Sequence, residues 1–381
     1  MSTQKDAAAQ NRMGTAKMLP LILSMAVPAM FSMLIQALYN IVDSYFVAQI
    51  SQNALTAVSL AFPIQNLLTA FGVGTGVGVG SLISRRLGER HQQAADSAAT
   101  HGVILAVITW VFFAVAGALT ARPFIALYTQ DAEVIAMGET YLTIVTVASF
   151  GFFVACCVEK MLQATGSMIM PMIIQLVGAV TNIILDPIMI YGLFGFPAMG
   201  VAGAAAATVA GQILSMVVGL LILAFGKHAV SFSLRGFRFH GKTVRDIYVV
   251  GVPSIVMNAI GTVMTMAING ILAAFSAAAV NVFGVYFKLQ SFVFMPVFGL
   301  TQGLMPIMGY NYGARNKQRV TGAIKTGVII ALIINVVGTI IFELFPGELI
   351  SIFNATDELL KIGDPALCIV AIHFPIAAVG I

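Results

Sequence analysis

Hydrophobic residues occupy long, nearly uninterrupted stretches along the whole chain, and short polar segments separate them. Most stretches match or exceed the roughly 20 apolar residues that an α-helix needs to cross a bilayer. The pattern therefore predicts an all-α polytopic membrane protein with ten spanning helices. The predicted spans are 19–49, 54–84, 97–120, 136–158, 168–193, 200–226, 245–275, 280–309, 321–345 and 362–381.

The composition agrees with this pattern and excludes several classes of protein. Of the 381 residues, 59% are hydrophobic and only 9% are charged, whereas soluble domains are about 25% charged. A soluble enzyme and a disordered chain are therefore excluded. The three cysteines have no CxxC or metal-ligand spacing, and no nucleophile–base motif occurs in the spans. We expect no enzymatic activity and no cofactor, apart from a coupling ion.

Lysine and arginine are concentrated in four segments of the chain: residues 1–18, and the loops after the second, sixth and eighth predicted spans. Cytoplasmic loops of membrane proteins carry an excess of these residues. The pattern predicts that all four segments, and so the N-terminus, are cytoplasmic. Because the net charge of +4 is spread over short loops, nucleic acid is not an expected partner.

The chain repeats itself after 225 residues: Val27-Pro28 corresponds to Val252-Pro253, and Gly88 corresponds to Gly313. A unit of six helices returns to the same side of the membrane, so the two copies are parallel repeats. The second copy stops early, since Ile381 corresponds to Cys156, which predicts a truncated piece of a twelve-helix protein. The expected domains are a cytoplasmic tail 1–18, an N-terminal lobe 19–226 with helices 1–6, a cytoplasmic linker 227–244, and a truncated C-terminal lobe 245–381 with helices 7–10.

Asp43 and Asp186 are the acidic residues expected inside the spans, where a carboxylate at the helix centre costs about 2.5–3.5 kcal/mol on insertion scales. Both are predicted at similar depth, near the end of the bundle opposite the basic loops. Asn182 lies one turn before Asp186, and Asn40 lies one turn before Asp43. Such oxygen-rich groups can hold Na⁺ or exchange a proton. The alternative is that these side chains only lock the first and fifth helices together.

The second lobe lacks this pair, because Ile268 occupies the position that corresponds to Asp43. Lys288 is the only Lys or Arg expected deep inside a span. It either faces a central cleft or extends its charged end toward the membrane surface. The polar residues expected to line a substrate cleft are Gln36, Tyr39, Gln163, Asn258, Lys288 and Gln290.

Four segments resemble the multidrug and toxic compound extrusion family, in its bacterial DinF-like branch. They read LYNIVDSYFVAQI (38–50), LQATGSMIMPM (162–172), TNIILDPIMIYGLFGFPAMGVAGAAAAT (181–208) and MPVFGLTQGLMPIMGYNYGAR (295–315). The resemblance implies two six-helix lobes around a cleft, in a bacterial plasma (inner) membrane. It also implies export of organic, often cationic, compounds in exchange for H⁺ or Na⁺. The family's acidic residue of the first helix falls on Asp43, and its Asn and Asp of the fifth helix fall on Asn182 and Asp186.

The predicted function is therefore a secondary antiporter that works by alternating access, with Asp43, Asp186, Asn182 and Asn40 coupling the ion. Whether the ion is H⁺ or Na⁺ stays open, since carboxylates and amides serve both. A monomer suffices, with small organic substrates and the bilayer as partners. The alternatives are a flippase for a lipid-linked sugar precursor of the same superfamily, and an intramembrane enzyme or a channel. A flippase cavity is expected to hold several cations, whereas Lys288 is nearly alone.

Overall fold

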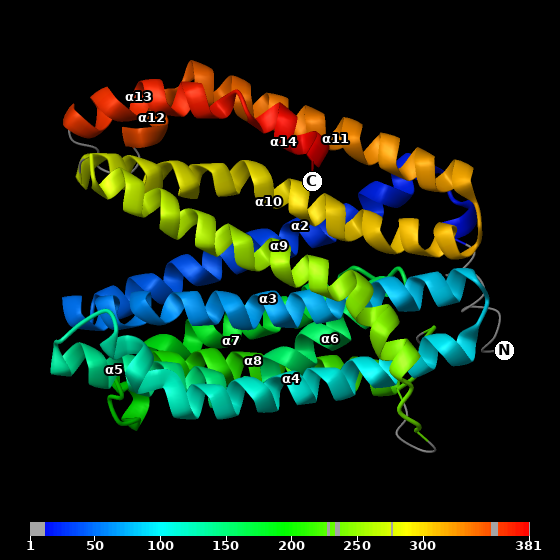
Figure 1. Ribbon diagram of the computed structural model, residues 1–381, viewed down its shortest axis with the longest axis horizontal. Coiled ribbons are helices and arrows are strands. Elements are labelled where there is room, and N and C mark those ends of the chain that lie inside the picture. The colour runs from blue at the N-terminus through cyan, green and yellow to red at the C-terminus, as the bar shows by residue number, and fades with distance from the viewer. Residues whose placement is uncertain (1–11, 227–228, 233–236, 276, 352–356, 381) are drawn as a thin grey trace.

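The computed structural model describes residues 12–226, 229–232, 237–275, 277–351 and 357–380, and its regular structure in these ranges is helical. Figure 1 shows the helices lying lengthwise beside one another. The predicted linker 227–244 falls partly outside the described residues, and the next helix begins at Gly241. The main helices are α2 (Met18–Ala48), α3 (Gln52–Gly88), α4 (Gln92–Ala126), α5 (Ala132–Val147), α6 (Phe150–Ala164), α7 (Ile169–Tyr191), α8 (Val201–Phe225), α9 (Gly241–Ala273), α10 (Ala277–Gly313), α11 (Lys317–Leu344), α12 (Pro346–Ser351), α13 (Asp357–Ala371) and α14 (Phe374–Gly380).

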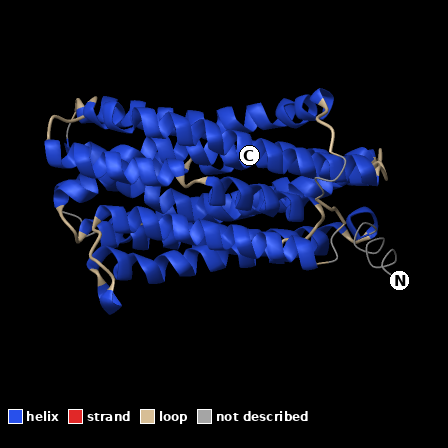
Figure 2. Ribbon diagram, turned by 90° about the horizontal axis from the view of Figure 1, so that it is seen from below, coloured by secondary structure: helices blue, strands red, loops and turns tan. Residues whose placement is uncertain are grey.

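Within the described residues, eight helices are long and apolar enough to cross a membrane, and two bent pairs of helices raise the number to ten. The ten predicted spans agree with this count. The fourth span consists of α5 and α6, which meet at a bend of 44° near Ser149, and the tenth consists of α13 and α14, which meet at 42° near His373. The bends fall at corresponding places of the 225-residue repeat. The loops that join the long helices lie at the two ends of the bundle (Figure 2).

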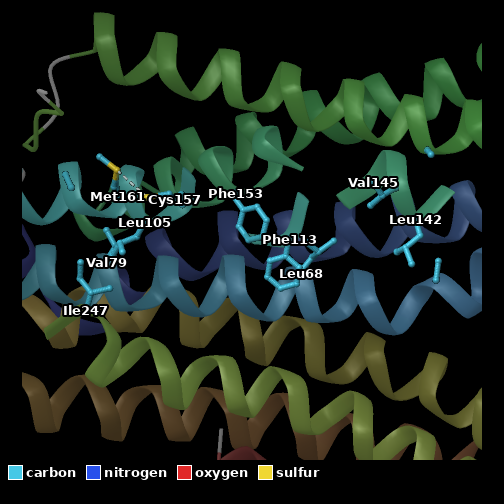
Figure 3. Packing of buried hydrophobic residues seen from close by; sticks show 14 of the residues in the cluster. Leu68, Val79, Leu105, Phe113, Leu142, Val145, Phe153, Cys157, Met161 and Ile247 are labelled. Atoms are coloured by element: carbon cyan, nitrogen blue, oxygen red, sulfur yellow. Dashed lines mark hydrogen bonds between the residues drawn. The ribbon is translucent and has the colours of Figure 1, made fainter. Parts of the chain in front are cut away.

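Helices α2–α8 form the first lobe. The larger hydrophobic core lies in this lobe, around α3. Leu68 of α3 lies near Phe113 of α4, whose ring stacks with that of Phe153 on α6 with centroids 5.7 Å apart, and Val79 lies farther along α3 near Leu105 (Figure 3). Because lipid tails are as apolar as these side chains, close packing rather than the hydrophobic effect holds such helices together. Ile247 of α9 joins this cluster, so the second lobe, α9–α14, packs directly on the first.

Glycines allow the two lobes to approach backbone to backbone. A Cβ atom on Gly74 of α3 would lie 2.8 Å from the backbone nitrogen of Ile255 on α9. The corresponding glycine of the repeat, Gly299 of α10, would place a Cβ 2.6 Å from Cα of Met30 on α2. Met30 and Ile255 are also 225 residues apart. The lobe interface is therefore pseudo-symmetric, with α3 against α9 and α10 against α2.

The same symmetry holds at the end of the bundle that carries residues 12–17 and the loops 89–91 and 314–316, which we call the basic end. A Cβ on Gly88 would collide with the carbonyl oxygen of Tyr310, and one on Gly313 would collide with that of Arg85. Tyr310 and Arg85 again correspond in the repeat. Gly78 and Gly303 form a third corresponding pair, which lies against the backbone of Ile247 on α9 and of Ala26 on α2. We call the six glycines of these three pairs the glycine seam: Gly74, Gly78, Gly88, Gly299, Gly303 and Gly313.

Hydrogen bonds between the basic segments show that they share this end. Arg86 contacts Asp246 at the start of α9, with 3.4 Å between Nη2 and Oδ2. Arg319 donates from Nη2 to the carbonyl oxygen of Met13, at 3.0 Å. Gln92 donates to the carbonyl oxygen of Ala229, in the segment after α8. The distribution of lysine and arginine thus predicted correctly that these segments lie together.

Candidate ion and substrate site

The ends of α2 and α7 are joined at the side of the bundle opposite the basic end. The hydroxyl of Tyr191 donates to the carbonyl oxygen of Phe46 at 3.0 Å, and the two rings meet edge to face with centroids 6.3 Å apart. α7 ends at Gly192, whose φ of +75° is a left-handed conformation that favours glycine. This junction lies just beyond Asp43 on α2 and Asp186 on α7.

Asp186 is completely buried and belongs to a small polar cluster. The side-chain amide of Asn182 donates to Asp186 Oδ1 at 3.2 Å and to the hydroxyl of Thr208 on α8 at 3.3 Å. Asp43, from α2, is close enough to Asp186 to interact electrostatically. We call Asp43, Asp186 and Asn182 the acid–amide cluster. The spacing of four residues between Asn182 and Asp186 brings the two side chains together, as the sequence predicts.

Each member of the acid–amide cluster has a buried oxygen atom without a hydrogen-bond donor among the described residues. These atoms are Oδ1 of Asp43, Oδ1 of Asn182 and Oδ2 of Asp186. A buried acceptor that lacks a partner costs about 1–3 kcal/mol. A proton on a carboxylate, or a cation that prefers oxygen ligands, removes this cost. The described residues contain no group of three or more His, Cys, Asp or Glu able to hold a metal, so Na⁺ here would also need amide or hydroxyl oxygens.

A cavity of about 350 Å³ lies beside this cluster within the first lobe, and Gln302 of α10 is the second-lobe residue among its lining residues. It contains the predicted cleft residues Gln36 and Tyr39, and the predicted ion-coupling residues Asn40 and Asn182. Gln163, also predicted for the cleft, is not among the lining residues, although its side chain is 3.5 Å from that of the lining residue Gln302.

The structure does not bring the three second-lobe residues of the predicted cleft to this cavity. Asn258, Lys288 and Gln290 are not among its lining residues. Asn258 is exposed, and its amide donates to the carbonyl oxygen of Ser254 one turn earlier. Lys288 is exposed and Gln290 is half-buried. Their positions within the predicted spans do not indicate on which face of the helix they lie.

Two cavity residues escaped the sequence analysis, because the fourth span was predicted to end at 158. Instead, α6 continues to Ala164 and carries Glu159 and Lys160, which are 8% and 9% exposed. The expectations that Lys288 is the only basic residue, and Asp43 and Asp186 the only acids, deep inside a span were therefore wrong. The residues after Lys160, MLQA, are all strong helix formers and indicate the continuation.

The sequence model of the MatE family matches residues 28–188 and 253–381. This chain belongs to the MatE family. The two matched segments begin at Pro28 and Pro253, which correspond in the internal repeat. The family assignment also agrees with the resemblance of the four sequence segments, and it identifies the chain as a multi-span membrane protein.

Similar proteins span most of this chain. A probable multidrug resistance protein NorM from Thermotoga maritima is 29% identical over 90% of this chain and 73% of its own length. The multidrug export protein MepA from Staphylococcus haemolyticus is 30% identical over 83% of this chain and 69% of its own. The crystal structure of a MATE protein in complex with MaL6 matches with a TM-score of 0.90 and 25% identity, covering 96% of this chain and 82% of that one.

Proposed function

We propose that this MatE-family chain is a secondary antiporter, which exports small organic compounds by alternating access in exchange for H⁺ or Na⁺. The observation that carries the proposal is the set of three buried oxygen atoms in the acid–amide cluster that have no donor among the described residues, next to the cavity of the first lobe. A bound proton or cation stabilises such a cluster, so its occupancy responds directly to an ion gradient. The basic end is then cytoplasmic, in a bacterial plasma membrane.

The position of α2 suggests how ion binding reaches the cavity. This one helix carries Asp43 in the cluster, Gln36 and Tyr39 in the cavity wall, and Met30 at the glycine seam. A cation that neutralises the two carboxylates removes the repulsion between Asp43 on α2 and Asp186 on α7. The packing of α2 against α7 then changes, and with it the cavity wall and the contact of α2 with α10. One monomer holds all of these groups.

The names of the relatives and the size of the cavity support small organic substrates. The NorM and MepA relatives are named for multidrug resistance and export. A cavity of about 350 Å³ falls within the range of roughly 300–1,000 Å³ that is typical of small-molecule sites. Its lining combines apolar groups with amides such as Gln36 and Asn40. This mixture suits amphipathic compounds with a few polar groups.

Efflux from proteoliposomes tests the proposal. The purified chain is reconstituted, vesicles are loaded with a fluorescent organic cation, and a pH gradient and a Na⁺ gradient are imposed separately. We expect one of the two gradients to drive efflux. Asp43→Asn and Asp186→Asn should each reduce efflux to the level of dye-loaded vesicles without protein. Glu139→Gln, which removes the carboxylate of a half-buried residue 3.7 Å from Arg122, is the matched control and keeps the wild-type rate. Wild-type efflux by Asp43→Asn would refute the coupling role.

A further inference from the structure

A short stretch of chain, residues 12–17, lies across the boundary between the two lobes at the basic end. It leads directly into α2 of the first lobe. Met13 is the buried residue of this stretch, with 1% of its surface exposed, whereas the others are half-buried or exposed. A methionine buried this completely beside exposed neighbours indicates that the stretch is docked in a fitting place on the rest of the protein.

The second lobe holds the backbone of this stretch. The carbonyl oxygen of Met13 accepts hydrogen bonds from Asn311 Nδ2 of α10 and from Arg319 Nη2 of α11, both at 3.0 Å. Arg319 Nη2 also donates to the carbonyl oxygen of Ala16 at 2.9 Å. The guanidinium group thus spends its charge on two backbone carbonyls of the stretch. Hydrogen bonds from a charged donor are stronger than those between neutral groups, so Arg319 is the main anchor.

The first lobe receives the side chain of Met13. Gly166, in the turn between α6 and α7, has a φ of +85°, and a Cβ there would lie 3.4 Å from Sδ of Met13. On the side of the second lobe, a Cβ on Gly14 would lie 3.3 Å from Cε1 of Tyr310, near the end of α10. The stretch is therefore wedged between the end of α6 and the end of α10.

The same two helices meet at the wall of the cavity. Lys160 of α6 donates to Oε1 of Gln302 of α10 at 3.0 Å, and both residues line the cavity. Gly76 of α3 leaves room for the lysine, since a Cβ there would lie 2.8 Å from its Cγ. Tyr310 follows Gln302 by eight residues, about 12 Å along a helix. Residues 12–17 thus lie between α6 and α10 on the side of the cavity that faces the basic end.

The internal repeat contains a second crossing of this kind, in the opposite direction. Residues 237–242, just before and at the start of α9, correspond to residues 12–17. The backbone N–H of His240 donates to Nε2 of His101 on α4 at 2.9 Å, and the rings of Phe237 and His101 lie with centroids 4.8 Å apart. The stretch that precedes each lobe therefore docks on the other lobe, and the two crossings tie the lobes together at the basic end.

We propose that residues 12–17 form a gate that closes the cavity from the basic end, and that Asn311 and Arg319 are the positioning residues that hold this gate shut. Opening at the basic end moves Gly166 of the first lobe away from Tyr310 of the second, so the gate cannot keep its contacts with both. Its release from the second lobe then opens the route to the cavity. This inference rests on the alternating access of the proposed function and names the element that controls one of its two openings.

The gate is the direct continuation of α2, which carries Asp43 near its other end. A change in the packing of α2 therefore moves the gate together with the helix. The hydrogen bonds from Asn311 and Arg319 oppose this movement, because the guanidinium group would lose the two carbonyl oxygens that it contacts. The strength of these bonds thus sets how often the basic end opens.

Distances between spin labels in the full chain, measured by double electron–electron resonance in nanodiscs, test the gate. The labels are attached to Gln93→Cys and Gln318→Cys, after the native cysteines are replaced by alanine. Both glutamines are exposed, lie at the basic end of different lobes and correspond in the repeat. In Arg319→Met, we expect the ratio of long to short distances to rise about tenfold or more, as the loss of two hydrogen bonds to a charged group implies. A folded Arg319→Met with the wild-type distribution would overturn the proposal.

Control variants separate the gate contacts from the loss of a charge. Lys325→Met removes the same charge from an exposed position of α11 and should keep the wild-type distribution. Arg319→Lys retains a charged donor and should restore most of the short distances. If Arg319→Met does not fold, Met13→Ala decides, since it removes the side chain that contacts Gly166. It should raise the ratio about threefold or more, and an unchanged ratio would reject the gate. Met257→Ala, at a residue that is 73% exposed, is its control.

A second pair of labels distinguishes a gate from a merely structural contact. Gln130 and Glu348 are exposed residues near the opposite end of the bundle, one in each lobe. When the basic end opens by alternating access, the distance between these two labels should stay the same or become shorter. Longer distances at both ends in Arg319→Met would show a general loosening of the lobes and would reject the gate.

The outcome also separates the gate from the antiport mechanism. Opening of the basic end in Arg319→Met, without gradient-driven efflux by the wild-type chain, would retain the gate and reject antiport. Gradient-driven efflux by the wild type, with unchanged distances in the gate variants, would retain antiport and reject the gate. Opening in the variants together with gradient-driven efflux by the wild type supports both.

Discussion

The two lobes share their backbone contacts but differ in their buried chemistry. Gly74, Gly78 and Gly88 of the first lobe pack on the second just as Gly299, Gly303 and Gly313 of the second pack on the first. The two lobes differ in their buried ionisable side chains. Asp186, Glu159, Lys160 and His101 lie in the first lobe, whereas the buried polar residues described in the second are Asn311 and Asn335.

This difference separates what the repeat needs for packing from what one copy needs for chemistry. The glycines recur because the close approach of the helices is needed on both sides of the pseudo-twofold axis. The carboxylates do not recur, since Ile268 takes the place of Asp43. In the proposed mechanism, the first lobe thus senses the ion, while the second lobe provides a matching surface.

The largest expected contrast is between two buried asparagines, one in each lobe. Asn182 and Asn335 are 2% and 0% exposed, and each has a buried Oδ1 that no described residue reaches as a donor. Asn182→Leu should reduce gradient-driven efflux to background, because the acid–amide cluster loses an oxygen and a donor to Asp186. The side-chain amide of Asn335 donates within its own helix, to the carbonyl oxygen of Ala331. Asn335→Leu should therefore keep efflux within about twofold of the wild-type rate and the free energy of unfolding within roughly 1 kcal/mol of the wild-type value.

Initial efflux rates from proteoliposomes and melting temperatures of the purified variants measure this contrast. The thermal measurement is the control, since Asn182→Leu should fold with a melting temperature close to that of the wild type. Equal loss of efflux in both variants would mean that the two lobes contribute equally to coupling.

The next contrast tests the symmetry of the glycine seam. Gly88→Ala and Gly313→Ala should each lower the free energy of unfolding by about 1–3 kcal/mol, because each new methyl group meets a backbone carbonyl that cannot rotate away. Gly261→Ala is the matched control: no atom lies within 4 Å of its Cβ position in α9. It should be neutral or stabilising by up to about 1 kcal/mol, since alanine favours the helix. Unfolding in increasing sodium dodecyl sulfate provides the measurement.

The two seam variants should also agree with each other. If Gly88→Ala lowered the free energy of unfolding several times as much as Gly313→Ala, the backbone contacts would be symmetric in geometry but not in energy.

The smallest expected effect concerns a charged group at the basic end that only the first lobe has. Glu89 accepts hydrogen bonds from Arg85 Nε at 3.0 Å and Arg86 Nη1 at 2.8 Å, and the corresponding residue of the repeat is Ala314. Partial burial raises the pKa of Glu89, but the hydrogen bonds from Arg86 and Arg85 outweigh it, so that its pKa is lowered from the ordinary 4.5. The ionised form is therefore stabilised in the folded protein.

A carboxyl group with a lowered pKa stabilises the fold above its unfolded pKa, and this stabilisation disappears as the pH falls through the folded pKa. Glu89→Gln should therefore lower the stability by less than about 1 kcal/mol at pH 7. The difference from the wild type should begin to shrink as the pH falls below about 4.5 and should be lost once the pH is below the lowered pKa of Glu89 in the folded protein. Melting temperatures of both proteins from pH 7 to pH 3.5 measure it, and a difference that does not shrink over this range would show that packing rather than charge is involved.

The sequence predicted those features that depend on depth and periodicity. The ten spans, the 225-residue repeat, the shared end of the basic segments and the pairing of Asn182 with Asp186 all follow from the length and spacing of residues. Glu159 and Lys160 were missed because charged residues normally mark the end of a span, and a single chain does not show that a neighbouring helix has a glycine at position 76 to accept the lysine.

Long apolar helices also give little indication of which face is turned inward. Around Asn258 on α9 and Lys288 on α10, apolar residues occupy every side of the helix, so periodicity does not distinguish the cavity from the lipid. The packing of the two lobes decides which face of each helix lies toward the cavity, and that packing depends on residues far away in the chain. For the same reason the bends near Ser149 and His373 were not predicted.

The residues of the glycine seam have a hydrogen atom where other residues have a side chain. Its contacts are therefore made by uncharged groups. A membrane potential does work only on charges that move through it, about 2.3 kcal/mol per elementary charge and 100 mV. Opening and closing the seam contacts is therefore electrically silent. Any voltage dependence of the proposed transport cycle would originate in the ion at Asp43 and Asp186, in the charges of the substrate, and in Glu159 and Lys160.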